Sequence, residues 1–283
     1  MIIVVSPAKA LDFESPLATQ KTSKPSLLKR SEHLVGVLSK KTPDELGSLM
    51  SLSDSLAELN FERYQDWSTP FTKKNARPAI LSFNGDTYTG LNAPESFSEE
   101  DYDYAQNTLR ILSGLYGVLR PLDLIQPYRL EMGTRLETEH GNSLYEFWGN
   151  SLTESLNKAL ASSPGEAIII NLASNEYFKS VHVDELHCPI VTPVFLDRKD
   201  GGDYKTVSFY AKRARGSMAS WVIRNRISKA KNLSDFTEDG YAFCTERSTS
   251  ESPVFTRTNR CLLYTSDAAD EGLGVDLGGR RII

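Results

Sequence analysis

The sequence predicts an α/β protein in which a mixed sheet carries flanking helices, and three observations predict it. Short runs of apolar and β-branched residues recur along the 283 residues, as expected of buried strands. Segments with helical periodicity alternate with these runs, as in α/β folds. Polar residues follow several runs directly, and ligands of α/β proteins gather at the carboxyl ends of strands. The expected strands are 2–5, 79–83, 167–172, 190–196 and 206–209.

A polar loop follows the first expected strand. Residues 2–5 are all apolar, and Ser6, Lys9 and Asp12 follow them. A lysine and a hydroxyl just beyond a strand can hold an anion, although a solvated surface turn would show the same residues. The helices expected next are 27–39 and 53–67.

In the middle of the chain, a helix is expected to run into a turn marked by glycines. Gly114 and Gly117 break the helical spacing of the preceding apolar residues, which places the helix end near Ser113. Glycines near a helix end let main-chain amides approach a ligand closely. The turn resembles the hairpin of helix-hairpin-helix modules, which hold a nucleic-acid backbone by such amides, although those hairpins usually have one residue between the glycines and this one has two. The alternative is a plain helix C-cap followed by core leucines.

Charged residues surround the later elements. Residues 128–137 hold paired charges that could order a loop or grip a ligand, with mutual pairing on the surface as the alternative. A helix is expected at 144–160. The expected strand 167–172 follows this helix. Asn171 stands at the end of the strand, and Glu176 lies shortly beyond it.

A second informative segment, residues 204–232, is strongly basic. It contains eight lysines and arginines and no acid, a local charge of +8 against −5 for the chain. Ala214, Met218, Trp221 and Val222 form an apolar stripe at helical spacing, which leaves a basic face. We expect this face to contact a polyanion, with binding that weakens as salt rises, whereas the alternative is an ordinary solvated helix.

Composition indicates a globular protein. The apolar share is 40%, and no run approaches the ~20 apolar residues of a membrane span. The start of the chain has no signal-peptide pattern, so a cytoplasmic location is expected. The three cysteines and four histidines show no ligand spacing, so neither a metal nor a cofactor is predicted. Common catalytic motifs are absent from the sequence.

Six segments together resemble the YaaA family of bacterial cytosolic proteins linked to survival of peroxide stress. They are SPAKALDFESP, FNGDTYTGL, LSGLYGVLRPLDLIQPYRLEMG, INLASNEYFKSV, PVFLD and SFYAKRARG. The resemblance implies a single domain over 1–259, with an unusual α/β fold, a helix-hairpin-helix element and a positively charged cleft that binds DNA. It also implies a role in limiting free intracellular iron. Ala10 stands where threonine is commoner and Asn84 where lysine is frequent. Residues 260–283 change character abruptly and are expected to be non-native or disordered.

Two hypotheses follow, from different classes of function. The first is a DNA-binding stress protein that selects DNA form rather than base sequence. Its candidate contacts are Gly114, Leu115, Tyr116, Gly117, Arg120, Lys212, Arg213 and Arg215. The second is an enzyme acting on a nucleotide or a damaged DNA base. Its candidate catalytic residues are Ser6, Lys9, Asn171, Glu176 and Tyr210. Direct binding of iron is a third hypothesis, which the histidine and cysteine spacings do not support.

Overall fold

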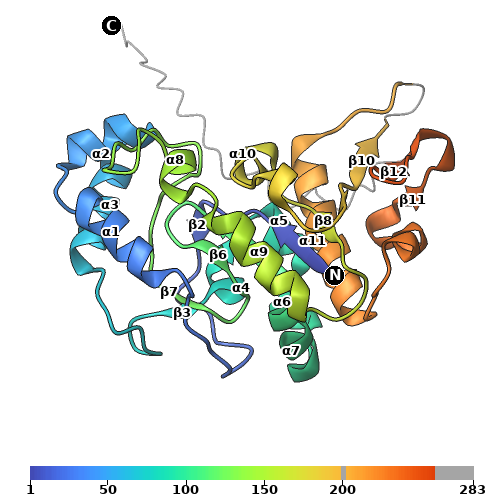
Figure 1. The fold of residues 1–283 in the computed structure, drawn as a ribbon, viewed down its shortest axis with the longest axis horizontal. Coiled ribbons are helices and arrows are strands. Elements are labelled where there is room, and N and C mark those ends of the chain that lie inside the picture. The colour runs from blue at the N-terminus through green and yellow to red at the C-terminus, as the bar shows by residue number, and fades with distance from the viewer. Residues whose placement is uncertain (199–201, 259–283) are drawn as a thin grey trace, which may run out of the picture.

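The computed structural model describes residues 1–198 and 202–258 and confirms the α/β class (Figure 1). A five-stranded sheet in the order β6-β5-β1-β8-β9 forms its centre. The strands β1, β5, β8 and β9 run parallel, and β6 is antiparallel to β5. Their bounds are β1 Ile2–Val5, β5 Leu109–Ser113, β6 Gly117–Leu119, β8 Ile169–Asn171 and β9 Ile190–Val191.

Three smaller sheets surround this one. The strands β10, β12 and β11 form a three-stranded sheet, while β2 pairs with β4 and β3 with β7. Their bounds are β2 Ala10–Leu11, β3 Arg77–Pro78, β4 Phe83–Asn84, β7 Leu124–Ile125, β10 Val194–Asp197, β11 Ala242–Phe243 and β12 Val254–Arg257.

Helices cover the central sheet and extend the molecule to both sides. In Figure 1, α1, α2 and α3 lie together at the left, and α11 lies beside the three-stranded sheet at the right. The α-helices are α1 Leu28–Leu38, α2 Pro43–Met50, α3 Asp54–Asp66, α4 Ala79–Ser82, α5 Asp86–Leu91, α6 Ala93–Ser96, α7 Glu99–Thr108, α8 Leu144–Trp148, α9 Ser151–Ser162, α10 Asn175–Phe178 and α11 Ser208–Arg224. The 3₁₀-helices are Val183–Glu185, Ala230–Asp235, Glu238–Gly240 and Thr245–Arg247.

The core is one cluster of buried apolar side chains that reaches from Met1 to Phe255. All four side chains of β1 are at most 1% exposed, because β1 is the middle strand and helices cover both of its faces. The expected helices 27–39 and 53–67 are confirmed as α1 and α3. No helix within 1–198 or 202–258 is long and apolar enough to cross a membrane. The expected tail, 260–283, lies outside the described residues.

The structure does not show the expected helix-hairpin-helix element, and the expected helix end near Ser113 is wrong. The helix α7 ends at Thr108, and residues 109–113 form β5, which hairpins into β6. Every side chain of β5 is buried, since the strand lies inside the sheet, so its apolar residues do not alternate with polar ones. The spacing of Leu109 and Leu112 happens to continue the helical pattern of α7, which is why a longer helix was expected.

Four other expected elements differ from the structure. Residues 79–83 are mostly the one-turn helix α4, and 206–209 precede and begin α11 instead of forming a strand. The expected helix 144–160 is divided into α8 and α9 at Gly149, whose φ of +49° is left-handed and interrupts the helix. Residues 190–196 divide at Pro193, which has no N–H to give to a sheet, into β9 and β10 of different sheets.

Candidate functional site

A pocket of about 540 Å³ lies at the carboxyl edge of the parallel strands. The loop after β1, the β4–α5 connection, Glu131, the segment after β8 and one face of α11 line it. Five predicted site residues, drawn from both hypotheses, therefore meet in one place. They are Ser6, Lys9, Glu176, Lys212 and Arg215.

Ser6 ties the loops that leave two neighbouring strands. Its hydroxyl accepts a hydrogen bond from the amide of Ser174 (2.9 Å) and donates to the Ser174 hydroxyl (3.3 Å). The hydroxyl of Tyr88 donates to the Ser6 carbonyl at 3.1 Å. These contacts hold the pocket floor in one shape, and none of them gives the Ser6 hydroxyl a carboxylate or imidazole base. Ser6 is thus a positioning residue in this arrangement.

Glu131 joins two cations at the pocket wall. Its carboxylate contacts Lys9 Nζ at 2.9 Å through one oxygen and the Arg129 guanidinium at 3.1 Å through the other. The side chain of Glu131 is 26% exposed and that of Lys9 63%, so Lys9 can leave the pair at little cost. Within residues 128–137, Arg129 and Glu131 therefore do pair with one another, and Glu131 also faces the pocket. Sequence reasoning noted this charged run but did not assign Glu131 to the site.

Glu176 presents a second carboxylate on α10. One of its oxygens accepts a hydrogen bond from the amide of Gly133 at 3.0 Å, and the Tyr145 hydroxyl donates to its carbonyl at 2.9 Å. Next to it, Tyr177 is buried, and this burial raises the pKa of its phenol. Glu176 lines the pocket, and a carboxylate in such a position can accept a proton from a ligand.

The pocket also receives two cations from α11, Lys212 and Arg215. They lie three residues apart on one helix face, and neither makes an ion pair with a described residue. Lys212 is exposed and Arg215 half-buried, and burial lowers the pKa of the Arg215 guanidinium. Asp86 is a third carboxylate of the pocket, so acids and bases are equal in number. The two cations of α11 thus remain available to an anionic ligand.

Two glycines hold α11 against α5 at this wall. A Cβ atom at Gly216 would lie 1.8 Å from the Thr87 carbonyl oxygen, and one at Gly90 would lie 2.0 Å from the Arg213 carbonyl oxygen. The two helix backbones are therefore in direct contact, because only glycine leaves room for this approach. The contact fixes Lys212 and Arg215 beside the β4–α5 connection.

The remaining enzyme candidates lie outside the pocket. Asn171 is buried at the end of β8, where its side-chain oxygen accepts from the Ala173 amide at 3.1 Å. Tyr210 packs under the Arg257 guanidinium, which lies 4.8 Å from its ring centre. Neither side chain lines the pocket, and these two assignments rested only on sequence position.

The glycine turn is not placed for contact with DNA. Leu115 and Tyr116 are 0% exposed, and a Cβ at Gly114 would lie 2.3 Å from the Leu130 carbonyl oxygen. The amide of Tyr116 donates to the Ser113 hydroxyl, and the Gly114 carbonyl accepts from the Trp148 indole. Gly117 lies inside the same hairpin with a φ of +70°. The turn is part of the core, so its amides do not face solvent.

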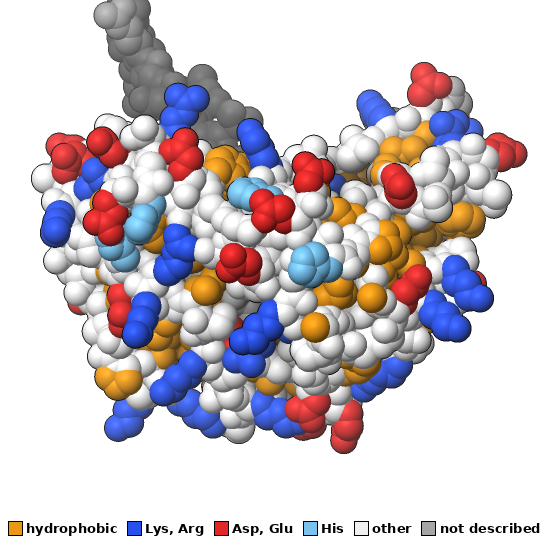
Figure 2. Space-filling view, viewed as in Figure 1, with side chains coloured by type: hydrophobic (Ala, Val, Ile, Leu, Met, Phe, Trp, Pro, Cys, Tyr) orange, Lys and Arg blue, Asp and Glu red, His pale blue; other side chains and the backbone are white. Residues whose placement is uncertain are grey.

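Several cations of the basic candidates have acidic partners elsewhere in the chain. Arg120 pairs with Asp123 at 2.9 Å, Arg224 with Glu238 at 3.2 Å, and Arg226 with Asp101 at 2.6 Å. Arg213 is half-buried and does not line the pocket. The predicted apolar stripe of α11 is confirmed, with Ala214, Met218 and Val222 at most 1% exposed and Trp221 partly buried. In Figure 2, basic and acidic side chains are interspersed over the visible face.

Comparison with protein families finds a match that covers most of the chain. A family model described as peroxide stress protein YaaA matches residues 1–247, a range that includes every residue lining the pocket.

Proposed function

The chain belongs to the family of the peroxide stress protein YaaA, and on that premise we propose that it binds DNA during peroxide stress in the cytoplasm. In this proposal the cations of the pocket hold the DNA backbone. The protein then protects DNA and proteins from oxidation and limits free intracellular iron.

The observation that carries the proposal is that Lys212 and Arg215 on α11 have no ion-pair partner within residues 1–198 and 202–258. The Arg215 guanidinium is partly buried and so has lost hydration, and no carboxylate in the described part of the chain pairs with it. A phosphate would provide that partner for Arg215, and Lys212, three residues away, would contact the same or the next phosphate. Lys9, which pairs with Glu131 at the pocket wall, is a third cation that could leave its pair to contact a phosphate.

The size of the pocket favours a particular form of DNA. A volume of about 540 Å³ falls among small-molecule sites, which occupy roughly 300–1,000 Å³, and is too small for a duplex. An unpaired or displaced nucleotide fits, with its phosphates at the α11 edge. We therefore expect bulged or single-stranded DNA to bind more tightly than plain duplex.

Fluorescence anisotropy with labelled plain, bulged and single-stranded DNA over a salt series tests the proposal. Replacing Lys212 and Arg215 together with glutamine is expected to weaken binding at least about tenfold. Loss of two phosphate contacts should also reduce the slope of log affinity against log salt by about 1.4–1.8.

A matched control removes the same charge elsewhere. Lys229 and Lys231 are exposed in a separate hollow beside Gly165, and replacing both with glutamine should leave affinity nearly unchanged. Equal losses in the two double variants, or an unchanged salt slope in the Lys212 and Arg215 variant, would contradict the proposal.

A second candidate function is an enzyme acting on a nucleotide or a damaged base. The observation that favours it is the presence of three carboxylates and Lys9 in one pocket, since such groups can exchange protons with a bound base. Glu176→Gln retains an oxygen for the Gly133 amide but cannot take a proton. It should reduce turnover of a lesion-containing duplex or a nucleotide at least about 100-fold while leaving DNA affinity within about threefold. Product formation by this variant at the wild-type rate would exclude Glu176 as the base.

A further inference from the structure

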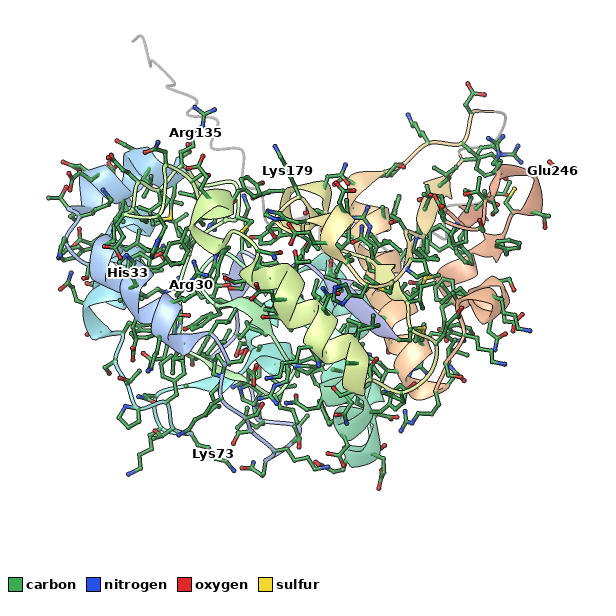
Figure 3. The ribbon with its side chains drawn as sticks, in the orientation of Figure 1. Arg30, His33, Lys73, Arg135, Lys179 and Glu246 are labelled. Atoms are coloured by element: carbon green, nitrogen blue, oxygen red, sulfur yellow. The ribbon has the colours of Figure 1, made fainter. Side chains whose placement is uncertain are left out.

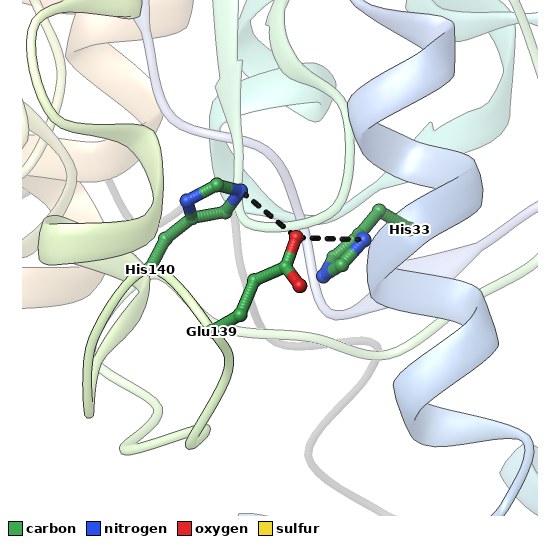
Figure 4. Close-up of side chains that lie close together, drawn as sticks. All are labelled: His33, Glu139 and His140. Carbon is green, nitrogen blue, oxygen red and sulfur yellow. Dashed lines mark ion pairs between the residues drawn. The ribbon is translucent and has the colours of Figure 1, made fainter.

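Three metal-ligating side chains meet at the surface, away from the pocket. His33 lies on α1, which Figure 3 shows at the left of the molecule, and Glu139 and His140 lie in the loop before α8. Figure 4 shows both imidazoles turned toward one oxygen of Glu139. That oxygen lies 3.9 Å from His33 Nδ1 and 3.5 Å from His140 Nε2. The three ligand atoms all lie within 4.8 Å of one another.

We propose that His33, Glu139 and His140 bind a divalent transition-metal ion. This inference does not rest on the proposed DNA binding. With bonds of about 2.0–2.2 Å, two ligands of a tetrahedral ion are about 3.4 Å apart. The Glu139 oxygen lies 3.5 Å from one imidazole nitrogen and 3.9 Å from the other, so rotation of these side chains can bring the three ligand atoms to a common ion.

Among the described residues, Glu139 is the acid that the two imidazoles face, and it belongs to the proposed site. Neither ring nitrogen of His33 has a hydrogen-bond partner among the described residues, and its Nε2 is buried. The ring of His140 likewise makes no hydrogen bond to the described part of the chain. A metal ion on His33 Nδ1 would therefore add a bond without breaking a hydrogen bond to the described residues.

The local packing holds the ligands in place. The ring of His33 stacks on Phe147 at 5.8 Å with an interplanar angle of 20°, and the ring of His140 lies 5.6 Å from the same phenylalanine. Phe147 is 1% exposed and so forms a rigid base. The loop turns at Gly141, whose φ is +139°, and the His140 amide donates to the Thr138 hydroxyl at 3.1 Å. Ordering the site thus costs less entropy than gathering three mobile side chains.

The donor set selects the class of metal. Two imidazoles and one carboxylate suit Zn²⁺, Fe²⁺, Co²⁺ or Ni²⁺, whereas Mg²⁺ and Ca²⁺ favour sites made of oxygen alone. Three protein ligands leave at least one position for water. The side chains of Glu139 and His140 are 68% and 51% exposed, so the ion would be reached directly from solvent. Sequence spacing could not reveal the site, because α1 brings His33 to the other two from a distant part of the chain.

Titration of the full chain, without a polyhistidine tag, with Co²⁺ tests the site by visible absorption and calorimetry, with Zn²⁺ as competitor. One Co²⁺ per chain is expected, displaced by Zn²⁺. His140→Ala and Glu139→Gln should each raise the dissociation constant at least about tenfold. Both residues are exposed, so circular dichroism should show an unchanged fold.

The control is a second exposed histidine and carboxylate pair, which has no third ligand within residues 1–198 and 202–258. His182 Nδ1 lies 3.6 Å from a Glu185 oxygen, and His182→Ala should leave Co²⁺ binding unchanged. Absence of stoichiometric binding to the wild-type chain would overturn the proposal, as would equal losses in the His140 and His182 variants. DNA affinity measured on the same proteins should not change, which keeps failure of this site distinct from failure of DNA binding.

Discussion

Gly216→Ala is expected to destabilise the protein by at least about 3 kcal/mol, at the upper end of the effects of overpacking. The added Cβ would lie 1.8 Å from the Thr87 carbonyl oxygen, a backbone atom that cannot rotate away. The helices α5 and α11 would have to separate, and α11 carries Lys212 and Arg215 into the pocket. The loss should be seen as a lower urea midpoint.

A matched glycine separates this steric effect from helix propensity. Gly36 lies on an exposed face of α1, and a Cβ there would meet nothing within 4 Å. Gly36→Ala should therefore stabilise the chain by up to about 1 kcal/mol, because alanine is the better helix former. If Gly216→Ala unfolded at the same urea concentration as the wild type, the close crossing of α5 and α11 would be wrong.

Arg257→Met is expected to cost about 3–5 kcal/mol of stability, the usual loss when one partner of a buried ion pair is removed. Arg257 contacts the Asp197 carboxylate at 2.7 Å between β12 and β10, and the Asp197 side chain is only 1% exposed. Methionine fills similar space but leaves that carboxylate without its cation. The hydroxyl of Tyr241 would remain its hydrogen-bond donor, at 2.8 Å.

The control for this substitution is Arg224→Met. Arg224 pairs with Glu238, and the two side chains are 35% and 43% exposed, so the pair is worth less than about 1 kcal/mol. Chemical denaturation of both variants should show a large difference between them. A double variant, Arg257→Met with Asp197→Leu, should recover part of the loss because no charge is then buried. Similar stabilities for the two single variants would show that Asp197 is not isolated from water.

Local sequence signals predicted some of the strands. They failed for strands whose position depends on pairing with distant parts of the chain. The run Ile2–Val5 was recognisable as a strand because its four residues are all apolar and β-branched. The strand β5 was not, because a strand buried on both faces shows no alternation, and its leucines continued the spacing of α7. The division at Pro193 and the pairing of β10 with β12 depend on contacts far apart in the chain.

The same distinction applies to the site. Residues that follow strands, such as Ser6 and Glu176, were predictable because parallel strands bring their carboxyl ends to one edge. The charge of Lys212 and Arg215 was visible in the sequence. The pairing of the other arginines with acids was not, because Asp101 and Glu238 come from separate elements. The burial of the glycine turn could not be deduced from its letters, because it depends on backbone packing against Leu130.

The order of strands in the three-stranded sheet has a consequence for synthesis on the ribosome. The strand β12 lies between β10 and β11, yet it is the last of the three to be made. At about 5–20 residues per second, the chain from Asp197 to Val254 takes roughly 3–11 s to synthesise. During that interval β10 has an open edge and Asp197 lacks its arginine. The nascent chain therefore cannot complete this sheet by adding strands in sequence, and a ribosome stalled before residue 254 would hold an unpaired strand ready to join another chain.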